Sequence, residues 1–298
     1  MNLFGGVELG GTKVICAVGT GPRDIRQLDR FPTANPEATI QRIIQFFHGQ
    51  DAKGHNITAL GVAAFGPLDA TPSSSNYGRI TNTPKPGWRN TDVVGPLKEA
   101  LDLPVCLDTD VNCAALAEWR WGAASGCNTA VYLTVGTGVG GGVLICGNLL
   151  HGLLHPEMGH MRLPHDWNAD PFEGTCPFHG DCLEGLTCGP AMMARWGVPA
   201  HALPEKHAGW GLEAHYLGLG LANIVCTLSP ERVVLGGGVM NHRGLLPLVR
   251  ERVRINLNGY VQAPQLLTAI DEYIVSPALG EQSGVLGAIA LAQRESGD

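Results

Sequence analysis

The sequence predicts a two-lobed α/β protein that contains an internal duplication. An apolar strand, a glycine turn and a second apolar strand occur near the start, in FGGVELGGTKVICAVG, and again from residue 132, in YLTVGTGVGGGVLICG. A length of 298 residues suits two lobes of ordinary size, and two lobes imply a cleft. The composition, 44% hydrophobic and 16% charged with 41 glycines, is typical of a compact chain with many tight turns.

Charge and hydropathy exclude several classes of protein. A net charge of -7 without a run of Lys or Arg argues against a nucleic-acid partner. The start, MNLFGGVELGG, lacks the basic and apolar regions of a signal peptide, and no 18-residue apolar run could span a membrane, so we expect a cytoplasmic protein. Nine cysteines, most of them in apolar runs, indicate reduced core thiols without disulfides; those in apolar runs are Cys16, Cys106, Cys113, Cys146 and Cys226.

Apolar periodicity predicts the remaining elements. Residues 36–47 place isoleucines and a phenylalanine at helical spacing, which predicts an amphipathic helix covering a sheet. Short apolar runs predict strands, and helical patterns predict three further helices; the strands are 59–64, 104–107 and 231–235, and the helices are 114–121, 189–196 and 212–228. Residues 280–293 are small throughout, which predicts a closing helix packed tightly on the first lobe.

The glycine turns are candidate phosphate-binding sites. At Gly10, Gly11 and Thr12 the turn exposes backbone N–H groups and adds a hydroxyl, while Glu8 just before it is a candidate to hold Mg²⁺ through water. One such turn could be a plain hairpin, but two of them can hold a polyphosphate. The turns match neither a Walker loop nor the strand-turn-helix of a Rossmann fingerprint.

Three further segments offer ligand-binding groups. The turn at Phe65 and Gly66 follows a buried strand and presents backbone amides. The polar stretch that follows is either a surface loop or the means of presenting Asn82 and an aromatic wall, Trp88, to a sugar. Three glycines at 236–238, after a buried strand, let a flat ring such as adenine approach the backbone.

Asp110 is the candidate catalytic base. The strand 104–107 stops at Asp108-Thr109-Asp110, and a helix follows, so these carboxylates lie at a strand-to-helix switch. A carboxylate there is favoured by the field of the helix N-terminus. Either aspartate could instead be only the helix N-cap. We favour that structural role for Asp108 and catalysis for Asp110.

The stretch from His155 to Glu184 predicts a zinc-binding loop. His160, Cys176, His179 and Cys182 form H-x15-C-x2-H-x2-C, a spacing that allows tetrahedral coordination. Four protein ligands close the coordination sphere, so this zinc is structural. The alternative is a redox cysteine pair with incidental histidines. Folding the loop on a metal would bring Glu157 and Glu184 together and could form a pocket for hydroxyl groups.

Taken together, these motifs resemble the ROK family of sugar kinases, and within it the fructokinase branch. The resemblance covers nearly the whole chain and rests on five ordered motifs: Glu8 to Lys13, Asp108 to Asn112, Gly136-Thr137-Gly138, the zinc loop, and Gly236-Gly237-Gly238. It implies two ribonuclease-H-like lobes of the actin and hexokinase type, with residues 1–112 plus 279–298 in the first lobe and 113–278 in the second. It also implies a homodimer.

The resemblance also implies roles for individual residues. Asp110 would be the base, with Phe65, Gly66, Asn82, Thr109, Glu157, His160 and Glu184 near the sugar. ATP would be held by Gly10, Gly11, Thr12, Lys13, Gly136, Thr137, Gly138, Gly236, Gly237 and Gly238. Four positions depart from the glucokinase-like pattern and agree with the fructokinase branch: Glu8, Thr109, Phe65 to Pro67, and His179.

The expected activity is transfer of a phosphoryl group from Mg-ATP to a hexose, with fructose favoured. Glucose, mannose or an N-acylmannosamine remain alternative substrates within the same family. A catalytically silent sugar sensor is a rival from another class of protein. The presence of Asp110 and of both glycine turns argues against it, because a sensor does not need them. A nicotinamide dehydrogenase with structural zinc is a third hypothesis. It would need a glycine turn that opens a helix, whereas the glycine turns here lead back into strands.

Overall fold

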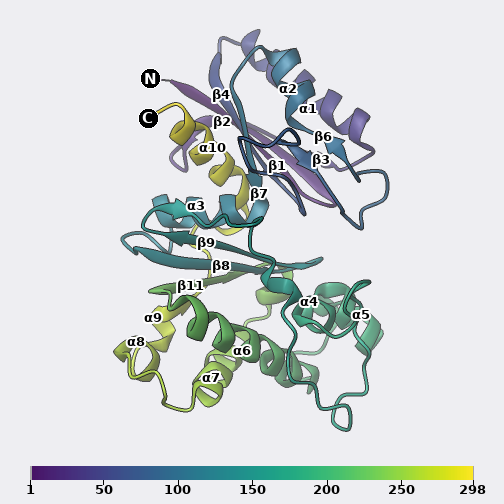
Figure 1. Ribbon diagram of the computed structural model, residues 1–298, viewed down its shortest axis with the longest axis vertical. Helices are drawn as coiled ribbons and strands as arrows, with labels where there is room; N and C mark the ends of the chain where they lie inside the picture. The colour runs from purple at the N-terminus through teal and green to yellow at the C-terminus, as the bar shows by residue number, and fades with distance from the viewer. Residues whose placement is uncertain (1, 298) are drawn as a thin grey trace. The chain divides into compact units, whose positions relative to one another are not determined.

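The computed structural model describes residues 2–297, which form two compact units. Each unit is built on a mixed sheet with helices, which confirms the predicted α/β class (Figure 1). Unit 1 consists of the chain up to Ser125, Leu149–His155 and the chain from Ala278, and unit 2 consists of Gly126–Asn148 and Pro156–Pro277.

Unit 1 contains the first glycine hairpin and the expected base. Its elements are β1 (Leu3–Leu9), β2 (Lys13–Gly21), β3 (Asp24–Pro32), α1 (Pro36–Asp51), β4 (Ile57–Ala64), β5 (Arg79–Ile80), β6 (Thr91–Asp92), α2 (Val94–Leu101), β7 (Val105–Thr109), α3 (Asp110–Trp121), the 3-10 turn Gly280–Gln282 and α10 (Ser283–Glu295). The sheet order is β3-β2-β1-β4-β7, with β1 antiparallel to β2 and parallel to β4.

Unit 2 contains the second hairpin and the cysteine-rich loop. Its elements are β8 (Thr129–Val135), β9 (Val139–Ile145), β10 (Asn148–Leu149), the 3-10 turn Met158–His160, α4 (Leu183–Thr187), α5 (Gly189–Trp196), the 3-10 turn Ala200–Ala202, α6 (Gly209–Leu228), β11 (Arg232–Gly236), the 3-10 turn Gly238–Asn241, α7 (Leu245–Leu257), α8 (Pro264–Leu267), α9 (Ile270–Tyr273) and β12 (Ile274–Val275). The order β10-β9-β8-β11-β12 repeats that of unit 1 and supports the predicted duplication.

The closing helix α10 packs directly on the sheet of unit 1. A Cβ on Gly61 of β4 would lie 1.9 Å from the carbonyl oxygen of Ala288, and one on Gly287 would lie 1.9 Å from that of Cys113 in α3. Only glycine therefore allows α10 to approach both β4 and α3 this closely. Because α3 packs against α10, it belongs to unit 1, whose first segment runs to Ser125. The lobe boundary that the sequence analysis places after residue 112 stays a prediction.

Two expectations about buried residues need correction. Trp88 is fully buried, donates its indole N–H to the Ala34 carbonyl at 3.0 Å and packs edge-on against Phe65, so it is a core residue and not an exposed aromatic wall. All nine cysteines are free thiols, but Cys146 and Cys226 are exposed and not part of the core. Cys146 follows β9 in a turn with φ of 51°, and Cys226 lies on the outer face of α6.

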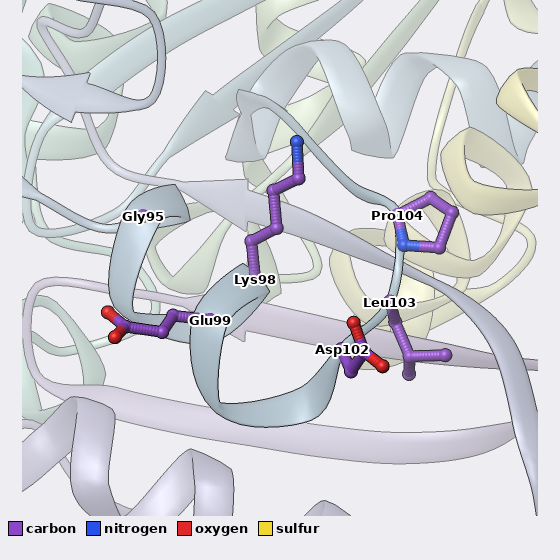
Figure 2. A pocket seen from close by; sticks show the side chains of 6 residues that line it. All are labelled: Gly95, Lys98, Glu99, Asp102, Leu103 and Pro104. Atoms are coloured by element: carbon purple, nitrogen blue, oxygen red, sulfur yellow. The ribbon is translucent and has the colours of Figure 1, made fainter.

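A shallow hollow lies at the C-terminal end of α2 (Figure 2). It is lined by Gly95, Lys98, Glu99, Asp102, Leu103 and Pro104, none of which is a predicted site residue. Across residues 2–297, no helix combines the length and the apolar character that a membrane crossing requires. The cytoplasmic location and the homodimer stay predictions.

Candidate functional site

The predicted site residues of unit 1 meet at one edge of its sheet. In the register of the parallel strands, Leu9 pairs with Ala64, and Ala64 pairs with Thr109. The first glycine turn, the turn at Phe65 and the residue Asp110 each follow directly after one of these three aligned positions. Loops at the carboxyl ends of adjacent parallel strands lie together, which is the usual position of a binding site in such sheets.

The first glycine turn is a tight hairpin with an open tip. The N–H of Gly10 donates to the carbonyl of Lys13 at 3.0 Å and closes the turn, while the hydroxyl of Thr33 donates to the Gly10 carbonyl at 2.7 Å. Gly11, Thr12 and Lys13 are exposed, and a Cβ on Gly11 would meet no atom within 4 Å. The tip therefore has room for phosphate oxygens, as the sequence predicts.

Glu8 lies beneath this turn, against the N-terminus of α10. A Cβ on Gly284 would come within 2.6 Å of its carboxylate. Burial raises the pKa of Glu8, although the charge of Lys13 and the N–H of Val285 partly offset the effect. Its Oε2 atom is buried and has no hydrogen-bond partner among the described residues. A carboxylate oxygen of this kind fits the predicted role as a ligand of Mg²⁺, either directly or through water.

The residue that caps α3 is Thr109, which corrects our assignment of this role to Asp108. The hydroxyl of Thr109 accepts the N–H of Asn112 at 3.0 Å. Asp108 is 3% exposed and has a different function. Its Oδ1 accepts the side-chain amide of Asn112 at 2.8 Å, and its Oδ2 lies 2.9 Å from Nε2 of His151. Asp108 thus ties the strand-to-helix switch to the segment Leu149–His155.

Asp110 is the first residue of α3 and is half-buried. Its Oδ1 accepts the N–H of Val111 at 2.9 Å, and the positive end of the helix dipole favours the ionised carboxylate. Asp108 and Thr109, which precede Asp110, both hydrogen-bond to Asn112, which follows it. The backbone is therefore fixed on both sides of Asp110. This geometry is consistent with the predicted base.

The pair of His151 and Asp108 predicts a pH-dependent stability. Its hydrogen bond with Asp108 raises the pKa of His151, an effect that burial only partly offsets. The protonated His151 therefore stabilises the folded state. This contribution is complete at pH values below the unfolded-state pKa of about 6.5, and it is lost as the pH rises through the higher folded-state pKa. We expect His151→Gln to lower the free energy of unfolding most at mildly acidic pH. Urea unfolding at several pH values tests this; an equal loss at every pH would contradict it.

The turn at Phe65 and Gly66 is held from two sides. The N–H of Phe65 donates to the Leu9 carbonyl at 3.0 Å, which links this turn to the end of β1. Nε2 of His155 accepts the N–H of Leu68 at 3.2 Å, and a Cβ on Gly66 would lie 3.3 Å from the same ring. The role of His155 was missed from sequence, since an isolated histidine ahead of a zinc motif gives no sign of this distant contact. Asn82 is exposed on the following loop.

In unit 2, the second glycine turn is anchored by Glu184. Its Oε2 accepts the N–H of Val139 at 2.9 Å, and a Cβ on Gly138 would lie 2.6 Å from this oxygen. The N–H of Gly189, at the start of α5, also donates to the Gly136 carbonyl at 2.7 Å. The turn is therefore docked on the helices that follow the cysteine-rich loop, while Thr137 at its tip is exposed.

The three glycines at 236–238 lie beside the second turn. Gly236 pairs with Thr134 in the parallel register of β11 and β8. Gly237 has φ of 97°, and a Cβ there would lie 2.3 Å from the Val135 carbonyl oxygen. Gly238 has open space at its Cα. The predicted phosphate and adenosine motifs of unit 2 are thus adjacent.

The carboxylates of Glu157 and Glu184 influence each other electrostatically. Burial raises the pKa of Glu157 to about 7, and the negative charge of Glu184 adds to the increase. Hydrogen bonds from sugar hydroxyls would stabilise the ionised form of such a buried carboxylate. The pair therefore has the chemistry expected of a site for hydroxyl groups.

The four predicted zinc ligands converge. Their ligand atoms all lie within 4.8 Å of one another. The Sγ atom of Cys176 is 3.6 Å from Nδ1 of both His160 and His179, and Sγ of Cys182 is 3.7 Å from Nδ1 of His160. For Zn–S of about 2.3 Å and Zn–N of about 2.0 Å, tetrahedral geometry separates sulfur from nitrogen by about 3.5 Å. The donor set and its spacing fit zinc.

A buried polar network that the sequence did not reveal supports this loop. Asp181, between two of the predicted ligands, lies 3.1 Å from Nδ1 of His165, and Nε2 of His165 lies 2.8 Å from the Asp170 carbonyl. The Asp170 carboxylate accepts the Tyr216 hydroxyl at 2.7 Å and pairs with Arg195 at 3.2 Å. These contacts join the loop to α5 and α6. No short motif connects residues spread over this length of chain.

Comparison with known proteins identifies the family. A model of the ROK family matches residues 4–295, almost the whole chain. This chain belongs to the ROK family.

Solved structures and a named relative agree with this assignment. A fructokinase from Zymomonas mobilis is 45% identical to this ROK protein over 295 residues, which cover 98% of the chain and 96% of the relative. The ROK hexokinase from Thermus thermophilus matches with a TM-score of 0.80 and 31% identity over 99% of both chains. A ROK glucokinase from Streptomyces griseus, solved with glucose and AMPPNP, matches with a TM-score of 0.79 and 25% identity over 98% of this chain and 100% of the relative.

Proposed function

We propose that this ROK sugar kinase is a fructokinase that transfers the γ-phosphoryl group of ATP to the primary 6-hydroxyl of fructose. The observation that carries the choice of fructose is the 45% identity with the Zymomonas mobilis fructokinase, compared with 25% for the Streptomyces griseus glucokinase. The departures from the glucokinase-like pattern, among them Glu8, Thr109 and His179, support the same choice.

Asp110 acts as the general base in this proposal. Its carboxylate accepts a hydrogen bond from the 6-hydroxyl, directs that oxygen in line at the γ-phosphorus and takes the proton as the new P–O bond forms. The bond between the γ-phosphorus and the bridging oxygen breaks, and ADP leaves. The capped start of α3 holds the carboxylate in place, so positioning supplies much of the acceleration.

The two glycine turns hold the phosphates of ATP. Their backbone N–H groups would carry the charge of the phosphoryl oxygens, with the hydroxyls of Thr12 and Thr137 and the ammonium of Lys13 assisting. Glu8 would hold Mg²⁺, which when bound neutralises part of this charge. The adenosine would lie against Gly236, Gly237 and Gly238, of which Gly238 has open space at its Cα.

The sugar is held by the turn at Phe65 and Gly66, by Asn82 and Thr109, and by the carboxylates of Glu157 and Glu184. If zinc is bound through Nδ1 of His160, the proton of that imidazole lies on Nε2, which can then donate to a sugar hydroxyl. The zinc itself would stabilise the loop and take no part in the transfer.

Glu184 links the two substrates in this proposal, which predicts a difference between two of its variants. Glu184→Gln keeps an oxygen that can accept the Val139 N–H, so it should raise KM for fructose and leave KM for ATP within about threefold. Glu184→Ala also removes the anchor of the second turn and should raise both KM values by about 10-fold or more. Steady-state kinetics with each substrate varied test the difference. Identical values for the two variants would contradict the anchoring role.

The proposed activity is tested by ADP release from Mg-ATP with fructose, glucose, mannose, N-acetylmannosamine or no sugar. The protein should be loaded with zinc. The expected result is turnover that depends on fructose. Turnover with another hexose in preference to fructose would overturn the substrate and keep the kinase, whereas binding of sugar without turnover would favour a sensor.

A further inference from the structure

Lys85 lies on a loop that is fixed at both of its ends. Before it, the N–H of Thr81 donates to the Pro67 carbonyl at 2.8 Å. After it, the fully buried Trp88 is held by its hydrogen bond to the Ala34 carbonyl. The Lys85 N–H also donates to the hydroxyl of Thr83 at 3.3 Å, and its carbonyl accepts the N–H of Trp88 at 3.3 Å. The backbone of this lysine is therefore well positioned.

The ammonium of Lys85 reaches the tip of the first glycine turn. Its Nζ donates to the carbonyl of Gly11, although 74 residues separate the two in the chain. An ammonium carries three N–H donors, and one carbonyl uses only one of them. Gly11 has open space around its Cα, so an anion seated at the tip could receive the remaining donors.

Lys13, the other cation at this turn, is already engaged electrostatically. It is the first residue of β2, and its charge is the largest influence that opposes the rise in the pKa of Glu8. Lys85, in contrast, pairs with an uncharged carbonyl, so its positive charge is not neutralised by that contact. A full charge held at a bare glycine tip is well suited to bind a phosphate oxygen.

We propose that Lys85 binds the terminal phosphate of ATP at the first glycine turn and stabilises the charge on the phosphoryl group during its transfer. This inference rests on the proposed kinase reaction and assigns to it a residue from outside the five sequence motifs. Lys85 forms no covalent bond and transfers no proton. It donates charge-assisted hydrogen bonds to the phosphoryl oxygens, which are stronger than hydrogen bonds between neutral groups.

The test compares Lys85→Met with Lys85→Arg and with Lys98→Met as the matched control. Lys98 is an exposed lysine of the same unit that lines the hollow at the C-terminal end of α2 (Figure 2). The strand that follows this hollow, β7, begins at the edge of the sheet opposite to the glycine turn. Affinities for Mg-AMPPNP and Mg-ADP are measured by calorimetry without sugar, followed by kcat and KM for ATP. Thermal unfolding shows that each variant is folded.

The expected result separates the two nucleotides. Lys85→Met should weaken AMPPNP binding by about 10-fold or more, change ADP binding by less than about twofold, and lower kcat by about 10- to 100-fold. Lys85→Arg should recover most of the preference for AMPPNP, because it restores the charge. Lys98→Met should change neither affinity.

An equal loss of affinity for ADP and AMPPNP would overturn the proposal, because it would mean that Lys85 only supports the shape of the turn. An unchanged preference for AMPPNP in Lys85→Met would overturn it as well. Because nucleotide binding is measured without sugar, a failure of the wild-type protein to use fructose would refute the proposed substrate and leave this test intact.

Discussion

Asp110→Asn should lower kcat for fructose phosphorylation by about 10²- to 10⁴-fold while fructose binding stays within a few-fold of the wild type. The amide keeps the shape of the side chain and retains an oxygen that can accept the Val111 N–H, so the start of α3 should stay intact. It cannot take the proton of the 6-hydroxyl. Pre-steady-state and steady-state assays of ADP formation measure the rate, and calorimetry with fructose measures the binding.

The control is Asp51→Asn, which removes the same charge from the exposed last residue of α1. It should leave both kcat and fructose binding unchanged. Turnover by Asp110→Asn at a rate close to the wild type would remove Asp110 from the role of base. A loss of fructose binding equal to the loss of rate would instead make it a residue that mainly holds the sugar.

The strands and their glycine turns could be predicted because their signals are local. Both hairpins, the sheet-covering helix near residue 40 and the helix 189–196 occur where apolar spacing and turn chemistry place them. Site residues at the carboxyl ends of β1, β4 and β7 then come together through the register of the parallel strands alone. The sequence motifs therefore predicted most of the candidate site of unit 1.

Contacts between distant parts of the chain could not be predicted. In the run Asp108-Thr109-Asp110 all three side chains can cap a helix, and the choice depends on His151, which takes the carboxylate of Asp108 and leaves Thr109 as the cap. The contact of Lys85 with Gly11 also joins segments without a shared motif. Such pairs carry no periodicity that a single sequence reveals.

The burial of Trp88 could not be predicted either, because it also depends on contacts with distant parts of the chain. A loop rich in Ser, Pro and Gly predicts exposure, and an aromatic residue within it suggests a ligand surface. Trp88 instead packs with Phe65 and donates to the Ala34 carbonyl, which satisfies its one polar group inside the core. Its burial fixes the loop that carries Lys85, so the residue matters to the site through the backbone it holds.

Cys176→Ala should remove the bound metal and lower both the thermal stability and the affinity for fructose. Cys176 is buried and lies 3.6 Å from two of the other ligand atoms, so the remaining three ligands leave the coordination sphere open. We expect zinc content to fall from about one ion per chain to near zero. Because His160 and the segment before Glu184 lose their anchor, KM for fructose should rise by about 10-fold or more. Elemental analysis, thermal unfolding and kinetics measure the three effects.

Cys226→Ala is the matched control, since this cysteine is exposed on α6 and lies outside the cluster. It should retain zinc, stability and activity. A zinc chelator should reproduce the Cys176→Ala defect in the wild type, and added zinc should reverse it. If Cys176 and Cys182 form a redox pair instead, then reductant and oxidant will change the activity while the chelator will not. An unchanged metal content in Cys176→Ala would remove that residue from the ligand set. Loss of zinc without any loss of fructose affinity would show that the sugar-binding carboxylates do not depend on the metal.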